Sequence, residues 1–209
     1  MASCESDWLS ACCNILLCAT ALHCSYKLFK NHRAPSVGLF ALGLSAAFCL
    51  FRFHSSYLAA LQREAEWAAK ALAPALVSFD YLWLSEDRNT ARILLCGSCL
   101  LLTGADWLSA DSLTVMTHCL GLSSLSCCLT VCLFAGNALG ALGGVALNLP
   151  LLVTVNAEVD TVASLVSPAA SRDLLNWIMK GSLAIGCWTS RLALEKFRLD
   201  VNDRYQISF

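Results

Sequence analysis

The sequence predicts an all-α membrane protein, a polytopic transmembrane helix bundle of about seven spans, with six spans as the alternative. Hydrophobic residues make up 57% of the chain and charged residues 14%, which leaves too few polar groups to cover a water-facing surface. Many apolar residues fall in runs close to the roughly 20 residues that cross a bilayer. Short polar segments separate several of these runs, so the chain can turn at the membrane surface.

Seven apolar segments are candidate spans between an N-terminal tail, 1–7, and a C-terminal tail, 195–209. The boundary between the fifth and sixth segments is the weakest, because only Gly136 and Asn137 interrupt the apolar run there. Fusion at that point would give the six-span alternative. The seven segments are Trp8–Phe29, Ser36–Phe53, Ala68–Leu84, Ala91–Leu108, Leu113–Ala135, Asn137–Val155 and Leu174–Leu194.

The longest polar insert, residues 54–70, has a helical pattern with leucines on one side and charged residues on the other. Glu66 and Lys70 have the spacing of a helical ion pair. We interpret the insert as an interfacial amphipathic helix that runs into the third span. A water-exposed extension of that span is the open alternative. Residues 158–166 carry a shorter pattern of the same kind.

Basic residues in the loops predict the orientation of the bundle. With the N-terminus outside, nine basic residues fall on the cytoplasmic side and four on the other. Seven spans therefore place the N-terminus outside or in a lumen and the C-terminus in the cytoplasm. Several spans near the lower length limit favour a thin membrane, such as the endoplasmic reticulum or Golgi. The nine are Lys27, Lys30, Arg33, Arg88, Arg92, Arg191, Lys196, Arg198 and Arg204.

The charge and the cysteines exclude several kinds of protein. A net charge of −1 lacks the basic field of a nucleic-acid binder. Most of the 13 cysteines lie in apolar runs, where thiols pack as small hydrophobic groups rather than forming a disulfide framework. Cys96 and Cys99 have redox-motif spacing without its βαβ context, and Cys127, Cys128 and Cys132 have no His or carboxylate at ligand spacing. No cofactor or metal is expected.

Residues spread over nearly the whole chain carry a family resemblance. They are Trp8, Leu22 and His23; Phe79–Tyr81, Trp83, Asp87 and Arg88; Leu133–Ala135, Asn137, Gly143 and Gly144; and Asp173, Trp177 and Arg191. In these positions the chain resembles the transmembrane protein 276 family of small multi-pass proteins. The resemblance implies a multi-pass membrane fold and carries over no active site.

Polar residues within the apolar segments are the candidate site residues, because ionisable groups in hydrocarbon usually face the bundle interior or a wet cavity. Asp80 could form an ion or proton site, or pair with Arg88 or Arg92 at interfacial depth to fix the third and fourth helices. His118 could be a general base or metal ligand, or bond across helices, and His23 is interpreted in the same way.

Small residues form a stripe in the sixth segment. Gly136, Gly140, Gly144 and Asn148 recur every four residues and would share one helix face. Two overlapping Gly-x-x-x-Gly units let another backbone approach closely, and Asn148 can donate a hydrogen bond at the end of the stripe. The partner is either a helix of the same chain, which we favour, or a second copy.

These features favour a non-enzymatic scaffold or an assembly or trafficking component, which acts through the lipid bilayer and a helix-packing partner or self-association. A small-solute or ion transporter is the alternative, with Asp80, His118 and Asn148 along its path; no inverted repeat supports it. A lipid-modifying enzyme using Asp80 with His118, and Ser78 beside them, is the third hypothesis. It requires these groups to lie within hydrogen-bond reach of the reacting atoms.

Overall fold

The protein is a bundle of antiparallel helices in a computed structural model that describes residues 2–50, 56–153 and 168–207. Seven α-helices and one short 3₁₀ helix, η1 (Ala105–Trp107), account for the secondary structure of these ranges, which contain no strand. The prediction of an all-α fold is confirmed. The α-helices are α1 (Ala2–Leu28), α2 (Arg33–Phe48), α3 (Ser56–Leu84), α4 (Arg88–Gly104), α5 (Ala110–Phe134), α6 (Ala138–Val153) and α8 (Pro168–Ile207).

Each predicted span overlaps one helix, but several helix ends differ from the prediction. Helix α1 begins at Ala2 and α8 runs to Ile207, so most of both expected tails is helical. Helix α2 ends at Phe48, before the predicted end of the second span. The amphipathic insert and the third span form the single helix α3 from Ser56 onward. The weak pattern at 158–166 lies outside the described residues.

Local capping explains where several helices begin and end. Asp87 accepts a hydrogen bond from the backbone N–H of Thr90 at the start of α4, and Ser109 does the same for Ser112 at the start of α5. Between α5 and α6, Gly136 adopts a φ of +67°, a backbone conformation that favours glycine. The short Gly136–Asn137 boundary is therefore a true helix end, which separates the fifth and sixth predicted segments into two helices.

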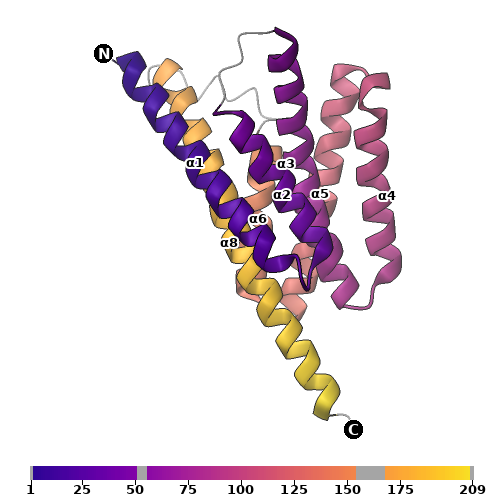
Figure 1. Ribbon diagram of the computed structural model, residues 1–209. Coiled ribbons are helices and arrows are strands. Elements are labelled where there is room, and N and C mark those ends of the chain that lie inside the picture. The colour runs from indigo at the N-terminus through magenta and orange to yellow at the C-terminus, as the bar shows by residue number, and fades with distance from the viewer. Residues whose placement is uncertain (1, 51–55, 154–167, 208–209) are drawn as a thin grey trace.

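Helix α3 occupies the centre of the bundle (Figure 1). It packs against α2, α4, α5, α6 and α8, while α1 packs against α2 and α8, and α6 packs against α5 and α8. Helix α4 contacts α3 and α5 and lies at the edge of the bundle. The first residues of α1 and the last residues of α8 lie at opposite ends of the bundle, as an odd number of antiparallel helices requires.

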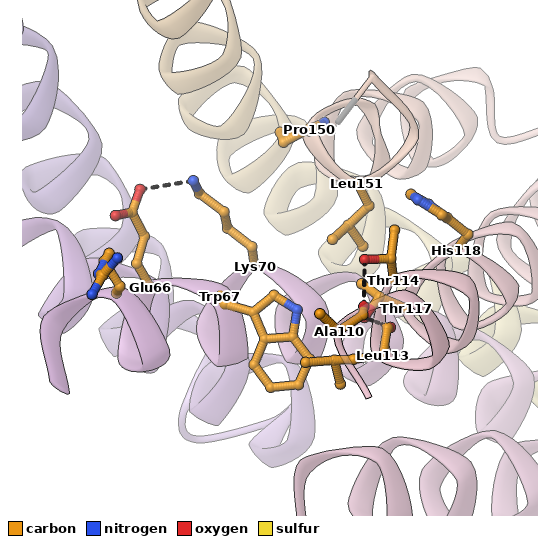
Figure 2. Close-up of a pocket in the computed structure, with 11 residues that line it drawn as sticks. Glu66, Trp67, Lys70, Ala110, Leu113, Thr114, Thr117, His118, Pro150 and Leu151 are labelled. Carbon is orange, nitrogen blue, oxygen red and sulfur yellow. Dashed lines mark hydrogen bonds and ion pairs between the residues drawn. The ribbon is translucent and has the colours of Figure 1, made fainter. Parts of the chain in front are cut away.

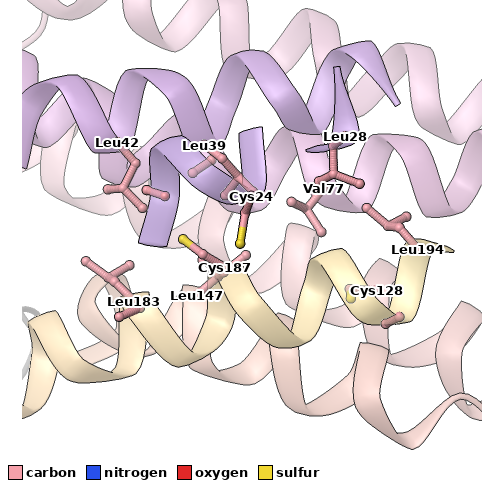
Figure 3. Close-up of a cluster of buried hydrophobic side chains, with 14 of the residues drawn as sticks. Cys24, Leu28, Leu39, Leu42, Val77, Cys128, Leu147, Leu183, Cys187 and Leu194 are labelled. Atoms are coloured by element: carbon pink, nitrogen blue, oxygen red, sulfur yellow. The ribbon is translucent and has the colours of Figure 1, made fainter. Parts of the chain in front are cut away.

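The core is built largely from leucine, alanine and cysteine side chains (Figure 3). Cys24 of α1 and Cys187 of α8 are fully buried there with free thiols. Burial of Cys187 was predicted from its apolar run. Serine and asparagine are buried as well. Ser25 and Ser36 bond each other between α1 and α2, with their hydroxyl oxygens 3.1 Å apart and each hydroxyl directed to the other residue's carbonyl.

The outer surface of the bundle is rich in large apolar side chains. Leu16, Ile93, Leu122 and Ile185 are each more than half exposed, and Phe134 is 90% exposed. Two helical segments, Trp8–Leu28 and Ala110–Phe134, are both long enough and apolar enough to cross a membrane by length and composition. Helices α2 and α6 are apolar but shorter.

Candidate functional site

Asp80 forms a hydrogen-bond contact that the sequence did not predict. Its Oδ2 atom lies 2.5 Å from Nδ1 of His32, the residue that precedes α2. The side chain of His32 is 3% exposed and that of Asp80 is 13% exposed, so water competes weakly for this contact. The expected pairing of Asp80 with Arg88 or Arg92 is wrong. Arg88 instead lies over the ring of Trp83, 5.4 Å from its centroid.

The contact between His32 and Asp80 ties the turn after α1 to the C-terminal part of α3. The second ring nitrogen of His32, Nε2, is buried and has no hydrogen-bond partner among the described residues. Sequence reasoning missed His32 because it lies in a polar turn of Lys30, Asn31 and Arg33 that reads as a solvated loop. The only available signal was a histidine directly before a helix start.

His118 lines a cavity of about 480 Å³ between α3, α5 and α6 (Figure 2). Both of its ring nitrogens are shielded from solvent and have no hydrogen-bond partner in the described part of the chain. The cross-helix hydrogen bond expected for His118 is therefore not made within those residues. Across the cavity, α3 presents Trp67 and Lys70.

Glu66 and Lys70 form the helical ion pair that their spacing predicted, with Oε1 and Nζ 2.7 Å apart. Burial alone would raise the pKa of the Glu66 carboxyl, but the charge and hydrogen bond of Lys70 outweigh it and hold the pKa below its ordinary value. Lys180 of α8 adds to this effect on the same pKa. Glu66 therefore carries its negative charge at neutral pH next to the cavity.

His23 and Asn148 occupy two further, separate environments. His23 lies on an exposed part of α1 and stacks on Trp188 of α8, with ring centroids 6.1 Å apart. Asn148 is fully buried and donates from Nδ2 to the carbonyl of Gly144, one turn earlier in its own helix, at 2.8 Å. Its Oδ1 atom has no hydrogen-bond partner within the described ranges. Asn148 thus bonds along α6 rather than across to a neighbouring helix.

The four polar candidates do not converge on one site. Asp80 and Lys70 lie on the same helix, ten residues apart, which corresponds to about 15 Å of rise. Lys70 and His118 line the cavity, whereas Asp80 is held at the turn between α1 and α2. An acid–base pair of Asp80 and His118 is therefore not assembled. Ser78, the third residue of that hypothesis, bonds Ser124 of α5 with an oxygen–oxygen distance of 2.9 Å.

The glycine stripe packs against helices of the same chain. A Cβ atom added at Gly140 would lie 2.5 Å from Sγ of Cys132, and one at Gly144 would lie 2.5 Å from Sγ of Cys128, both on α5. The favoured in-chain partner fits this arrangement. Gly136 does not belong to the stripe, because it lies in the turn before α6.

A second close approach, between α6 and α8, was not predicted. A Cβ atom at Gly143 would lie 2.9 Å from the backbone nitrogen of Ser190, and one at Gly186 would lie 2.9 Å from that of Leu147. Gly143 had been noted only for the family resemblance and Gly186 not at all, because a single glycine in an apolar helix gives no spacing signal. Asn137 adds a donor from Nδ2 to the carbonyl of Ala193 on α8, at 3.1 Å.

The cysteines form no metal centre in the described ranges. No group of three or more His, Cys, Asp or Glu side chains there could hold a metal ion. Cys96 and Cys99 are exposed on α4, and Cys128 and Cys132 are buried between α5 and α6. The buried positions of Cys128 and Cys132 give these two thiols packing roles.

Comparison with known proteins covers nearly the whole chain. It is 26% identical over 198 residues to transmembrane protein 276 of Rattus norvegicus, which is 93% of this chain and 96% of that protein. It is 27% identical to the Bos taurus protein of the same name over 92% of this chain and 95% of that protein. The Homo sapiens protein of the same name is 26% identical over 93% of this chain and 95% of that protein. No family model and no solved structure matches. The resemblance to the transmembrane protein 276 family is thus confirmed along more than nine tenths of the sequence.

Proposed function

We propose that the chain is a multi-pass integral membrane protein that acts without catalysis, as a scaffold or as an assembly or trafficking component. One observation carries the membrane assignment: large apolar side chains are exposed on the outside of the bundle, while several serine hydroxyls bond one another inside it. Residues such as Ile93 and Phe134 project outward, and Ser78 and Ser124 bond each other within the core. In water this distribution would be unfavourable, and in lipid it is the expected one.

The proposal includes all seven described helices as spans. Helices α2 and α6 have 16 residues each, which corresponds to a length of about 24 Å. That length fits a thin bilayer, such as the roughly 27 Å hydrocarbon layer of the endoplasmic reticulum, better than a thick one. The excess of basic residues at the C-terminal end of the bundle supports a cytoplasmic C-terminus and a lumenal or external N-terminus.

The spread of the polar candidates supports a role through contacts rather than chemistry. Asp80 is engaged by His32, Ser78 is engaged by Ser124, and His23 stacks on the outside of the bundle. A catalytic or transport site would need such groups to face a shared substrate position. The names of the similar proteins state only that they are transmembrane proteins, which agrees with the membrane part of the proposal.

The first experiment tests the membrane part. The native protein should stay with the membrane pellet after carbonate washing, and engineered glycosylation acceptors should be modified near the N-terminus but not after Ile207. Release into the wash would contradict the membrane assignment. Glycosylation at both ends would place the termini on the same side and contradict the seven-span topology while leaving the membrane assignment intact.

The second experiment tests the scaffold part. Purification in a mild detergent with light-scattering mass analysis should give a protein mass well above the 22.5 kDa of one chain. Ile93→Ala on α4 and Leu16→Ala on α1 shorten exposed side chains on two outer faces and form a matched pair. We expect one of them to weaken the assembly and the other to leave it unchanged. A particle of single-chain mass from several cell types would contradict the scaffold function.

A further inference from the structure

The cavity beside His118 has one cationic wall and one hydroxyl-bearing wall. Arg63, Trp67 and Lys70 recur at helical spacing and line it from α3. Thr114, Thr117 and His118 line it from α5. Figure 2 shows Trp67 and Lys70 on one side and His118 on the other, with Leu151 of α6 between them.

The charges around the cavity favour an anion. Arg63 and Lys70 contribute two positive charges and Glu66 one negative charge, which leaves one formal positive charge with His118 neutral. Glu66 shares its carboxylate with Lys70, whereas Arg63 makes no ion pair within the described ranges. The guanidinium of Arg63 is therefore the free cation of this lining, and its planar set of donors matches phosphate oxygens.

His118 supplies a second unused donor. Neutral imidazole carries one N–H, and neither ring nitrogen of His118 has a partner among the described residues although both are shielded from water. An unpaired polar group in such a place costs free energy, which a bound acceptor would recover. The hydroxyls of Thr114 and Thr117 donate to the carbonyls of Ala110 and Leu113 at 2.9 and 2.7 Å, and neither hydroxyl oxygen accepts from His118 within the described residues.

The remaining walls are apolar. Leu113, Pro150 and Leu151 line the cavity, and Trp67 has the amphipathic ring that prefers the membrane–water boundary. A water-soluble anion would leave these surfaces uncovered. A molecule with an anionic head and a hydrocarbon tail would satisfy both parts of the lining, since its head can meet Arg63 while its tail follows the apolar wall.

We propose that this cavity binds an anionic phospholipid, whose phosphate accepts from Arg63 on the α3 wall and one of whose other oxygens accepts from His118 on the α5 wall. The proposal rests on the membrane location proposed above, and it does not depend on the scaffold function. It gives α3 a role at each end: its first turns hold a lipid headgroup, and its last turns hold the His32 contact through Asp80.

The test is native mass spectrometry of the full chain in detergent, titrated separately with phosphatidylglycerol, phosphatidylcholine and inorganic phosphate. We expect one phosphatidylglycerol to bind in preference to phosphatidylcholine. Arg63→Gln and His118→Leu should each weaken phosphatidylglycerol about tenfold, the change expected for one lost charge-assisted hydrogen bond. Arg92→Gln on α4 and His23→Leu on α1 are matched controls, and they should leave the affinity unchanged.

The three ligands and the variants distinguish the competing outcomes. Equal phosphatidylglycerol affinity in Arg63→Gln, His118→Leu and the two controls would overturn the site. Inorganic phosphate binding as tightly as phosphatidylglycerol would overturn the lipid and assign the pocket to a soluble phosphate. Far-ultraviolet circular dichroism and elution volume identify a variant that has not folded. In that case Arg63→Lys is used in place of Arg63→Gln, or His118→Gln in place of His118→Leu. Each of these conservative variants should retain part of the affinity. Release of the chain by carbonate would instead reject the membrane location on which the proposal rests.

Discussion

Substitution of Gly186 by alanine should destabilise the bundle, whereas the same change at Gly181 should not. Both glycines lie in α8, so the two variants differ in packing and not in the type of helix. A Cβ atom at Gly186 would lie 2.8 Å from Cγ and 2.9 Å from the backbone nitrogen of Leu147 on α6. At Gly181 nothing lies within 4 Å of the added atom.

The expected difference follows from two opposing contributions. Replacing a glycine by alanine inside a helix adds about 1 kcal/mol of stability through the backbone, and this applies to both variants. Overpacking costs about 1–3 kcal/mol, and the upper part of that range applies at Gly186 because a backbone atom must move rather than the end of a side chain. We therefore expect Gly186→Ala to be about 2 kcal/mol less stable than the parent and Gly181→Ala to be up to about 1 kcal/mol more stable.

Reversible unfolding in mixed micelles, followed by circular dichroism, measures both free energies of unfolding. The separation between the two variants, about 3 kcal/mol, exceeds the uncertainty of such an extrapolation. If Gly186→Ala were as stable as Gly181→Ala, α6 and α8 would not be in contact at this point. The packing of α6 against α8 would then be incorrect.

Substitutions at three further positions test polar contacts. Asp80→Ala removes the partner of buried His32 and should cost about 1–3 kcal/mol, while Asp80→Asn, which keeps an acceptor, should cost less. Asn137→Ala removes the bond to the α8 backbone and the acceptor for the first turn of α6, and we expect a loss of about 1–3 kcal/mol. Glu66 has a folded-state pKa below its ordinary 4.5, so its pair with Lys70 stabilises the protein above that pH and the stabilisation disappears as pH falls through the folded-state pKa.

Each of these has its own check in the same unfolding assay. An Asp80→Ala variant as stable as the parent would show that the hydrogen bond to His32 contributes nothing. An Asn137→Ala variant as stable as the parent would contradict the tie between α6 and α8. For the ion pair, stability measured from pH 7 down to below 4.5 should fall more in the parent than in Glu66→Gln, and parallel curves would refute the assignment.

The sequence was sufficient for the helices because their signals are local. An apolar run, a capping serine such as Ser109 or a turn glycine such as Gly136 can be recognised within a few residues. Helix ends outside the apolar runs were harder to predict. Glu195–Ile207 has no glycine or proline to stop α8, yet its polar character reads as a tail.

Pairing between helices was not predictable, because it depends on residues far apart in the chain. The expectation for Asp80 chose the nearest arginines, whereas its actual partner lies 48 residues away, in a turn that no periodicity connects to α3. The cavity depends on three helices at once, so Lys70 and His118 could not be placed together from spacing. By contrast, the Glu66–Lys70 pair was predicted because one helix contains both residues.

The placement of small residues suggests what holds this bundle together in lipid. Outward leucines such as Leu122 exchange one apolar environment for another when the helices separate, so their contribution to association is small. Close backbone approach at Gly143 and Gly186 and hydrogen bonds such as that of Ser78 with Ser124 exist only in the assembled bundle. Leu122→Ala should therefore change the free energy of unfolding less than Gly143→Ala, because Leu122 is exposed whereas a Cβ atom at Gly143 would lie 2.9 Å from the backbone of α8. A larger loss for Leu122→Ala would mean that this face of α5 is covered, either by a partner chain or by a part of the protein that packs against it.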